Sequence, residues 1–166
     1  MLSTFKNILS KEEKTEDKEN RYHRLYIDIA KRISEMSYAK RSKVGCVIVK
    51  DGRIISMGWN GMPTGWDNEC EHLALWDNHV QLSNAILVTN DEVLHAESNA
   101  IAKLARDGQS SLGCTVYVTL APCLQCAKLI HQSGINQLVY TEDYRDSSGL
   151  EFLKKTPNFN IIKMEE

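Results

Sequence analysis

Two short motifs hold the residue types from which a catalytic metal site is built. His95 and Glu97 lie two positions apart, and Cys123 and Cys126 follow in a Pro-Cys-x-x-Cys run. Zinc prefers imidazole and thiolate ligands, and a catalytic zinc keeps one of about four positions open for water. His95, Cys123 and Cys126 leave that position open, so the sequence predicts a zinc site that activates water.

Glu97 is the one ionisable group in these motifs that is not expected to coordinate the metal. Zinc lowers the pKa of a bound water from about 15.7 toward about 7, which makes a nucleophile available at neutral pH. A carboxylate beside that water can take up its proton and deliver it to a departing nitrogen. We therefore expect one catalytic Zn²⁺ per chain on His95, Cys123 and Cys126, with Glu97 as the proton shuttle.

Helices must position these four side chains. Residues 96–106 are rich in helix formers, which places His95 at the entrance of a predicted helix. Cys123 and Cys126 lie in the first turn of a second predicted helix that begins at Pro122. The positive end of the helix dipole and the metal both favour the thiolate form of the cysteines there.

A closed structural zinc site is the main alternative for the two cysteines. Cys114 or Cys70 would then be the fourth ligand, and Glu97 would have no chemical role. The joint occurrence of His-x-Glu and Pro-Cys-x-x-Cys favours the catalytic interpretation, because this is the signature of zinc-dependent nucleobase deaminases.

The chain resembles the cytidine deaminase superfamily, and more closely its deoxycytidylate (dCMP) deaminases of phages and bacteria. The resemblance runs from about residue 22 to about residue 149. Beyond the zinc motifs it rests on residues 41–49 (RSKVGCVIV), 58–65 (GWNGMPTG) and 117–123 (YVTLAPC). The stretch 58–65 discriminates, since deaminases of transfer RNA or of free nucleosides share the zinc motifs but usually lack it.

The expected fold class is α/β. The resemblance implies a three-layer cytidine-deaminase-like fold, with a mixed central sheet of about five strands flanked by helices. The sequence agrees, because β-rich runs alternate with helical segments. An Asp-Gly pair joins the first two runs as a hairpin turn. The predicted strands span residues 44–49, 53–59, 115–120, 137–141 and 159–163.

Two parts of the chain are expected. Within residues 1–20, the second half is almost entirely polar or charged. This segment is therefore predicted to be a flexible arm or a solvated helix. Residues 21–166 predict a single zinc-dependent deaminase domain, in which residues 77–93 form a loop or a short helix. Helical spacing over residues 22–38 predicts a first helix with a core-facing stripe of Leu25, Tyr26, Ile29, Ile33 and Met36.

The resemblance implies hydrolysis of dCMP to dUMP and ammonia, which supplies dUMP for thymidylate synthesis. It places Asn60 on the deoxyribose 3′-hydroxyl, since an amide both donates and accepts hydrogen bonds; a simple Asn-Gly turn is the alternative. Tyr144 is expected to contact the substrate. Arg145 is expected to bind the 5′-phosphate, with Arg41 as a second cation, because a guanidinium donates two parallel bonds to phosphate. An ordinary surface arginine is the alternative for both.

Regulation is also implied by the resemblance. Such enzymes commonly form homo-hexamers that dCTP with Mg²⁺ activates and dTTP inhibits at sites between subunits. Arg106 matches a position at family subunit interfaces, although an ordinary cation at a helix C-terminus explains it equally well.

Some members carry a second, structural zinc. Here Cys70, His72 and His79, with Cys46 as a poor fourth ligand, make an incomplete set, so one zinc is favoured.

Composition narrows the class of protein. With 42% hydrophobic and 25% charged residues the chain is typical of a globular domain. A net charge of −2 argues against a stable nucleic-acid partner. Five cysteines without an apolar signal segment favour the cytoplasm, that of a host cell if a phage encodes the chain. Deamination of another cytosine nucleotide or of a polynucleotide base, and a noncatalytic zinc module, remain as alternatives.

Overall fold

The computed structural model describes the backbone of residues 2–75 and 85–165, and the side chains of residues 18–74 and 86–165. Four helices and seven strands are formed in this part of the chain. The helices are α1 (Leu2–Ser34), α2 (Ala96–Arg106), α3 (Leu124–Gln132) and α4 (Ser148–Lys154). The strands are β1 (Gly45–Lys50), β2 (Arg53–Trp59), β3 (Glu71–Leu75), β4 (Ala85–Thr89), β5 (Thr115–Leu120), β6 (Gln137–Glu142) and β7 (Asn160–Lys163).

A five-stranded mixed sheet forms the centre of the molecule. Its strand order is β2-β1-β5-β6-β7. Strand β1 is antiparallel to both β2 and β5, whereas β5, β6 and β7 run parallel. The five strands predicted from sequence are these five, with boundaries within one residue of those expected, so the predicted mixed sheet is confirmed.

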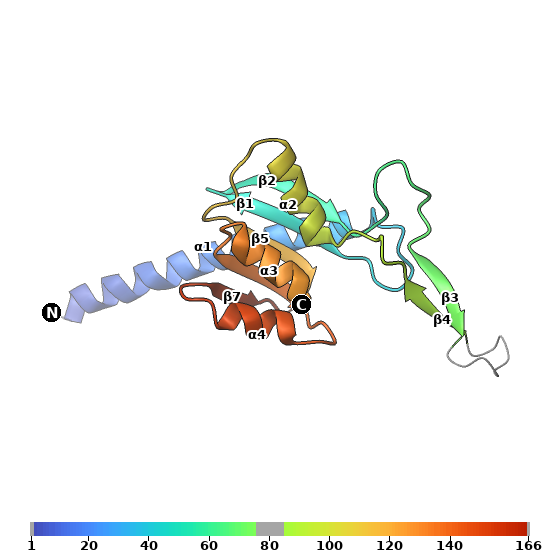
Figure 1. Cartoon of the computed structure of the whole chain (residues 1–166). Coiled ribbons are helices and arrows are strands. Elements are labelled where there is room, and N and C mark those ends of the chain that lie inside the picture. The colour runs from blue at the N-terminus through green and yellow to red at the C-terminus, as the bar shows by residue number, and fades with distance from the viewer. Residues whose placement is uncertain (1, 76–84, 166) are drawn as a thin grey trace.

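Helices cover both faces of this sheet. Helix α1 packs on one face against Val47, Val49, Tyr117 and Val139. Helices α2, α3 and α4 cover the other face, where the alternate side chains of the same strands are buried (Figure 1). Because successive side chains of a strand point to opposite faces, one β-rich run can supply both cores. The three-layer α/β architecture is therefore confirmed.

The turn between β1 and β2 has the geometry that its sequence predicts. Asp51 and Gly52 have φ angles of 49° and 72°. Two successive residues with positive φ are characteristic of a type I′ hairpin turn, whose twist matches that of the strands. The Asp-Gly hairpin is confirmed.

Helix α1 differs from the sequence prediction in extent and in its buried face. It begins at Leu2 and ends at Ser34 rather than near residue 38. Its buried residues His23, Tyr26, Ile27 and Ala30 follow the i, i+3, i+4, i+7 spacing of a single stripe. Leu25 is 49% exposed and Met36 58% exposed, so their assignment to the core was wrong. Tyr26, Ile29 and Ile33 do pack in the core, so the buried stripe overlaps the predicted one and is rotated toward Ile27 and Ala30.

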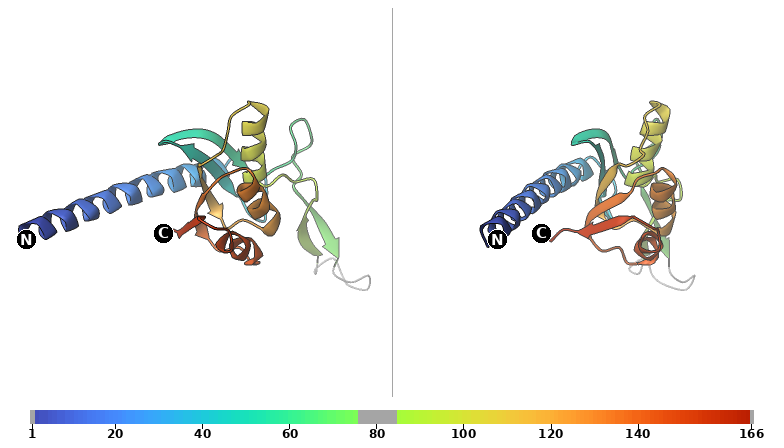
Figure 2. Two further views of the ribbon diagram at one scale, coloured as in Figure 1. Left: turned by 60° about the vertical axis from the view of Figure 1, so that its left-hand side comes forward. Right: turned by 90° about the vertical axis from the view of Figure 1, so that its left-hand side faces the viewer.

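The N-terminal half of α1 extends away from the sheet (Figure 2). None of the helices in the described part of the chain is both long enough and apolar enough to cross a bilayer.

A two-stranded ribbon of β3 and β4 stands apart from the main sheet (Figures 1 and 2). The two strands are antiparallel and pair Glu71 with Thr89 at the end nearest the body of the molecule. The expectation of a loop or a short helix over residues 77–93 was wrong for residues 85–89, which form β4. Residues 77–84 lie outside the described part of the chain.

Candidate metal and substrate site

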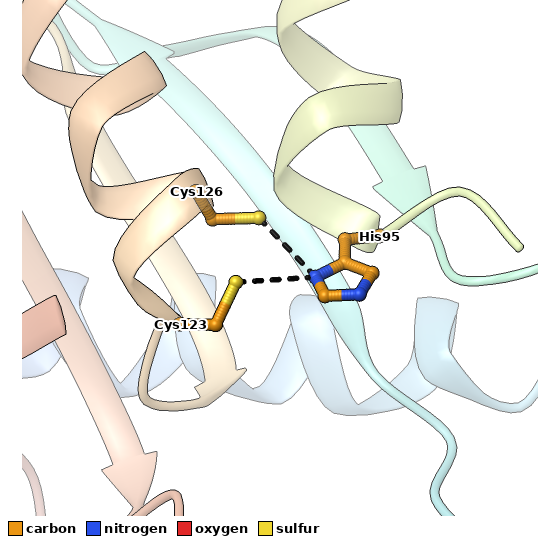
Figure 3. A group of neighbouring side chains, drawn as sticks. All are labelled: His95, Cys123 and Cys126. Atoms are coloured by element: carbon orange, nitrogen blue, oxygen red, sulfur yellow. Dashed lines mark hydrogen bonds between the residues drawn. The ribbon is translucent and has the colours of Figure 1, made fainter. Parts of the chain in front are cut away.

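The three predicted metal ligands converge between the first turns of α2 and α3 (Figure 3). His95 is the N-cap residue of α2 and Cys123 is the N-cap residue of α3. The Nδ1 atom of His95 lies 3.5 Å from Sγ of Cys123 and 3.3 Å from Sγ of Cys126. All three donor atoms lie within 4.8 Å of one another, so a single ion could contact all of them.

The chemistry of this donor set fits zinc. One imidazole nitrogen and two sulfurs are ligands that Zn²⁺ prefers, and a set of three leaves a coordination position for a small molecule. Cys114 is buried immediately before β5, and Cys70 is buried beside Ala39 and Val93. Neither cysteine belongs to the cluster of donors. The structural-zinc alternative therefore lacks the fourth ligand that the sequence offered for it.

A second metal cluster is not formed by the side chains that the structure describes. Cys46 is buried in the core and His72 is hydrogen-bonded to Asn90. His79, another candidate for a structural zinc, lies outside the described residues.

Cys123 is the thiolate of the cluster, whereas contact with Cys123 and burial raise the pKa of the Cys126 thiol. Hydrogen bonds with Cys126 and with His95 lower the pKa of Cys123 to about 3, against the opposing effect of burial. The same contact with Cys123 raises the pKa of His95. Cys123 also lies at the N-terminus of α3, where the helix dipole stabilises a thiolate.

Glu97 lies in the first turn of α2, beside the donor cluster but outside it. Its side chain is 4% exposed and interacts with Cys126. Burial raises the pKa of this carboxyl group. A buried carboxyl group next to a metal site is placed to exchange protons with a bound molecule.

One cavity of about 540 Å³ joins the cluster to the predicted substrate residues. Cavities of this size hold small-molecule ligands. Its wall includes His95, Glu97 and Cys123 together with all four predicted substrate contacts, which are Arg41, Asn60, Tyr144 and Arg145. Arg106 does not line it: this side chain is 74% exposed at the end of α2 and pairs with Asp107.

Asn60 holds the backbone that precedes β1. Its Oδ1 accepts a 2.8 Å hydrogen bond from the Val44 amide, and its Nδ2 donates a 2.8 Å bond to the Ser42 carbonyl. An amide side chain has two donor hydrogens and an oxygen with two lone pairs. One donor and one acceptor site therefore remain for a ligand, so the residue can shape the wall and contact a sugar hydroxyl at once.

Tyr144 and Arg145 enter the cavity wall just after β6. Tyr144 is half-buried against the core, and the Arg145 guanidinium lies 5.7 Å from the centre of its ring. Such stacking stabilises a cation without neutralising its charge.

Further cavity residues come from the β3–β4 ribbon and were not predicted. They include Glu71, Thr89, Asn90 and Asp91. The β-rich run at residues 85–89 could have indicated a strand, but no local pattern shows which segment the strand will approach.

A three-layer α/β fold with a His-Cys-Cys cluster beside a buried glutamate defines the class of zinc-binding deaminases. Residues 17–142 match the family described as the cytidine and deoxycytidylate deaminase zinc-binding region. This chain belongs to that family.

Individual relatives agree with this assignment. The deoxycytidylate deaminase of Enterobacteria phage T4 is 40% identical over 71% of this chain and 76% of its own length. The deoxycytidylate deaminase of Mus musculus is 33% identical over 75% of this chain and 74% of its own length. The crystal structure of dCMP deaminase from the cyanophage S-TIM5 in complex with dCMP and dUMP has a TM-score of 0.72 and 34% identity, covering 85% of this chain and 95% of that one.

Proposed function

We propose that this chain is a zinc-dependent deaminase that hydrolyses dCMP to dUMP and ammonia and so supplies dUMP for thymidylate synthesis. One observation carries the proposal: a single cavity is lined by His95 and Cys123 of the donor cluster, by Glu97 and by two arginines. A cavity for a mononucleotide substrate needs one end that acts on the base and another that binds the negatively charged phosphate. The similarity to deoxycytidylate deaminases supports cytosine as the base.

His95, Cys123 and Cys126 would hold the zinc ion. When bound, zinc supplies a Lewis acid that makes water a nucleophile near neutral pH. The oxygen of water adds at C4 of the ring, and the bond from C4 to the amino nitrogen breaks. Glu97 would first carry one proton from the attacking water to N3. It would then carry the second proton, from the new C4 hydroxyl, to the amino nitrogen, so that ammonia leaves, C4 becomes a carbonyl and N3 keeps its proton.

The other end of the cavity would recognise the nucleotide. Asn60 would contact the deoxyribose 3′-hydroxyl with its remaining donor and acceptor sites. Tyr144 would pack against the substrate, and Arg145 with Arg41 would bind the 5′-phosphate through charge-assisted hydrogen bonds.

The test is ammonia release from zinc-quantified protein with dCMP, CMP, deoxycytidine and dCTP. We expect dCMP to be preferred, and Arg145→Ala to raise KM for dCMP at least about tenfold more than KM for deoxycytidine, since a charge-assisted hydrogen bond is worth about 1.5–3 kcal/mol. Preference for dCTP would make the chain a deaminase of another cytosine nucleotide. Zinc-loaded protein inactive on all four compounds would contradict the proposal and direct the search to polynucleotide bases or a binding role.

We also propose the regulation that this family resemblance implies. The chain would form a homo-hexamer in the cytoplasm, activated by dCTP with Mg²⁺ and inhibited by dTTP, with Arg106 coupling subunits. Residues 1–20 would be an arm outside the single domain of residues 21–166. A dCMP saturation curve that stays hyperbolic and does not change with either triphosphate would contradict this regulation.

A further inference from the structure

The cavity wall before β1 is attached to the β3–β4 ribbon by one carboxylate. Oε1 of Glu71 accepts hydrogen bonds from the backbone amides of Lys40 (3.0 Å) and Arg41 (3.1 Å). Oε2 of Glu71 lies 3.1 Å from the same Lys40 amide. A carboxylate bound to several backbone N–H groups is a strong and directional contact. It fixes the backbone from which the Arg41 side chain extends.

The side chain of Arg41 is held by the same ribbon. Its Nη1 donates a 3.1 Å hydrogen bond to Oγ1 of Thr89. Thr89 is the residue directly opposite Glu71 in the β3–β4 ladder. Paired residues of a ladder project from the same face of a ribbon. One cross-strand pair thus holds both the backbone and the guanidinium of Arg41.

The charge of Arg41 is left available by this arrangement. Its hydrogen-bond partner among the described residues is a neutral hydroxyl, and the ion pairs formed in that part of the chain do not include Arg41. The charge of the Glu71 carboxylate is directed to backbone amides instead. Arg41 and Glu71 both line the cavity that contains Arg145 and the donor cluster.

We propose that Glu71 is a positioning residue for phosphate recognition, which acts by holding Arg41 in the wall of the nucleotide cavity. This inference rests on the proposed function and adds to it a residue that confers selectivity for the phosphorylated substrate. In this proposal Glu71, which lies outside the donor cluster, acts through Arg41 and not on the base. Its effect passes through the loop of residues 40–44, whose backbone is also hydrogen-bonded to Asn60.

The test compares Glu71→Ala and Glu71→Gln with wild type. We expect Glu71→Ala to raise KM for dCMP about tenfold with less than about a twofold change in kcat. The KM for deoxycytidine should change much less, because it has no phosphate. The KM of Glu71→Gln for dCMP should lie between those of wild type and Glu71→Ala, because the amide oxygen of Gln can still accept a hydrogen bond from the backbone. A matched control is Glu69→Gln, which removes a carboxylate of the same segment whose side chain is exposed and lies outside this cavity.

A double-mutant cycle separates positioning from a general loss of structure. If Glu71 acts through Arg41, Glu71→Ala should change KM for dCMP less than about twofold in an Arg41→Ala background. Calorimetric binding of dUMP and deoxyuridine to the same proteins gives a readout independent of turnover. Equal losses for nucleotide and nucleoside, or additive effects of the two substitutions, would overturn the inference. A wild-type protein that neither deaminates dCMP nor binds dUMP would instead overturn the proposed function itself.

Discussion

Glu97 and Cys126 lie side by side, yet their proposed roles differ, and substitution can tell them apart. Gln has nearly the shape of Glu but cannot take up a proton. Glu97→Gln should therefore retain zinc and lose turnover by roughly 10²–10⁴-fold, the usual contribution of a positioned acid–base group. Cys126→Ala should lose both zinc and activity. Ammonia release and zinc content measured on the same preparations check both expectations.

Glu92→Gln is the control for Glu97→Gln, because Glu92 is an exposed carboxylate a few residues away in the sequence. It should behave as wild type. Near-normal turnover of Glu97→Gln would mean that another group carries the protons.

The residues that sequence could predict are those that local spacing fixes. His95 and Glu97 lie at the start of one helix, and Cys123 and Cys126 lie at the start of another. The relative position of the two side chains in each pair therefore depends on only a few consecutive residues. Glu71 could not be predicted in this way. Its role depends on contacts with a loop about thirty residues earlier in the chain, and no short motif records such a contact.

At the scale of elements, the position of α2 depends on an unusually close contact with β2. A Cβ added at Gly58 would lie 2.3 Å from the Ala96 carbonyl oxygen and 2.7 Å from the Ala100 amide nitrogen. Gly58→Ala should push α2 outward, together with His95 and Glu97 at its start. We expect a loss of about 1–3 kcal/mol in unfolding free energy, as for other overpacked cores, and weaker zinc binding.

Urea unfolding and a zinc titration measure these two effects. Gly61→Ala is the matched control, because the nearest atom to its added Cβ lies 4.0 Å away and its φ angle is not positive. Unchanged unfolding and zinc affinity in Gly58→Ala would contradict the close contact.

Helix α1 carries a titratable group at its contact with the sheet. His23 is buried, its Nδ1 lies 3.0 Å from the Tyr117 hydroxyl, and its Nε2 has no hydrogen-bond partner in the described part of the chain. Burial lowers the pKa of His23, and Glu19 opposes this effect. The folded state therefore binds fewer protons than the unfolded state as pH falls below about 6.5, the usual pKa of histidine. Unfolding free energy should decrease through that range.

The measurement is urea unfolding between about pH 7.5 and pH 5.5 at saturating zinc. His23→Phe keeps a ring of similar size without a titratable group, so its unfolding free energy should decline less than that of wild type over this range. Other histidines titrate in both proteins, which makes the difference between them the relevant quantity. Parallel pH profiles would show that His23 does not contribute.

The elements themselves were predictable to different degrees. The strands of the main sheet and helices α2 and α3 have clear periodicity and Gly, Pro or Asp-Gly boundaries, and sequence located them. The ribbon was missed because β3 reads Glu-His-Leu-Ala-Leu, which lacks the β-branched residues typical of strands. For residues 1–20 the sequence leaves open a flexible arm or a solvated helix; residues 2–20 are part of α1, because no breaker separates the charged segment from the amphipathic one that follows it.

For the whole molecule, sheet topology explains why distant segments form one cavity. Strands β5 and β6 are parallel, so the segments after them, with Cys123 and Tyr144, leave the sheet at the same edge. Strand β1 is antiparallel to β5 and β2 is antiparallel to β1, so Arg41 before β1 and Asn60 after β2 reach that edge too. Ligands commonly bind beyond the carboxyl ends of parallel strands in α/β folds.

Zinc would join two separate parts of this arrangement, which gives it a role in stability as well as in chemistry. His95 precedes α2 and the two cysteines begin α3, so the unfolded chain does not hold the donors together. A ligand that binds only the folded state at a free concentration about 1,000 times its Kd stabilises it by about 4 kcal/mol. For a chain of this size that corresponds to roughly 8–16 °C in Tm.

Chelation of zinc should therefore lower Tm by that amount, and restored zinc should reverse the change. Thermal unfolding of wild type with and without chelator measures the effect. Cys126→Ala is the control, because a protein without the complete donor set should unfold at the same temperature under both conditions. Glu97→Gln should respond to chelation as wild type does, since Glu97 lies outside the donor set. If wild-type Tm did not respond to chelator, the His-Cys-Cys cluster would not be a metal site, and the chemistry proposed for Glu97 would lose its basis.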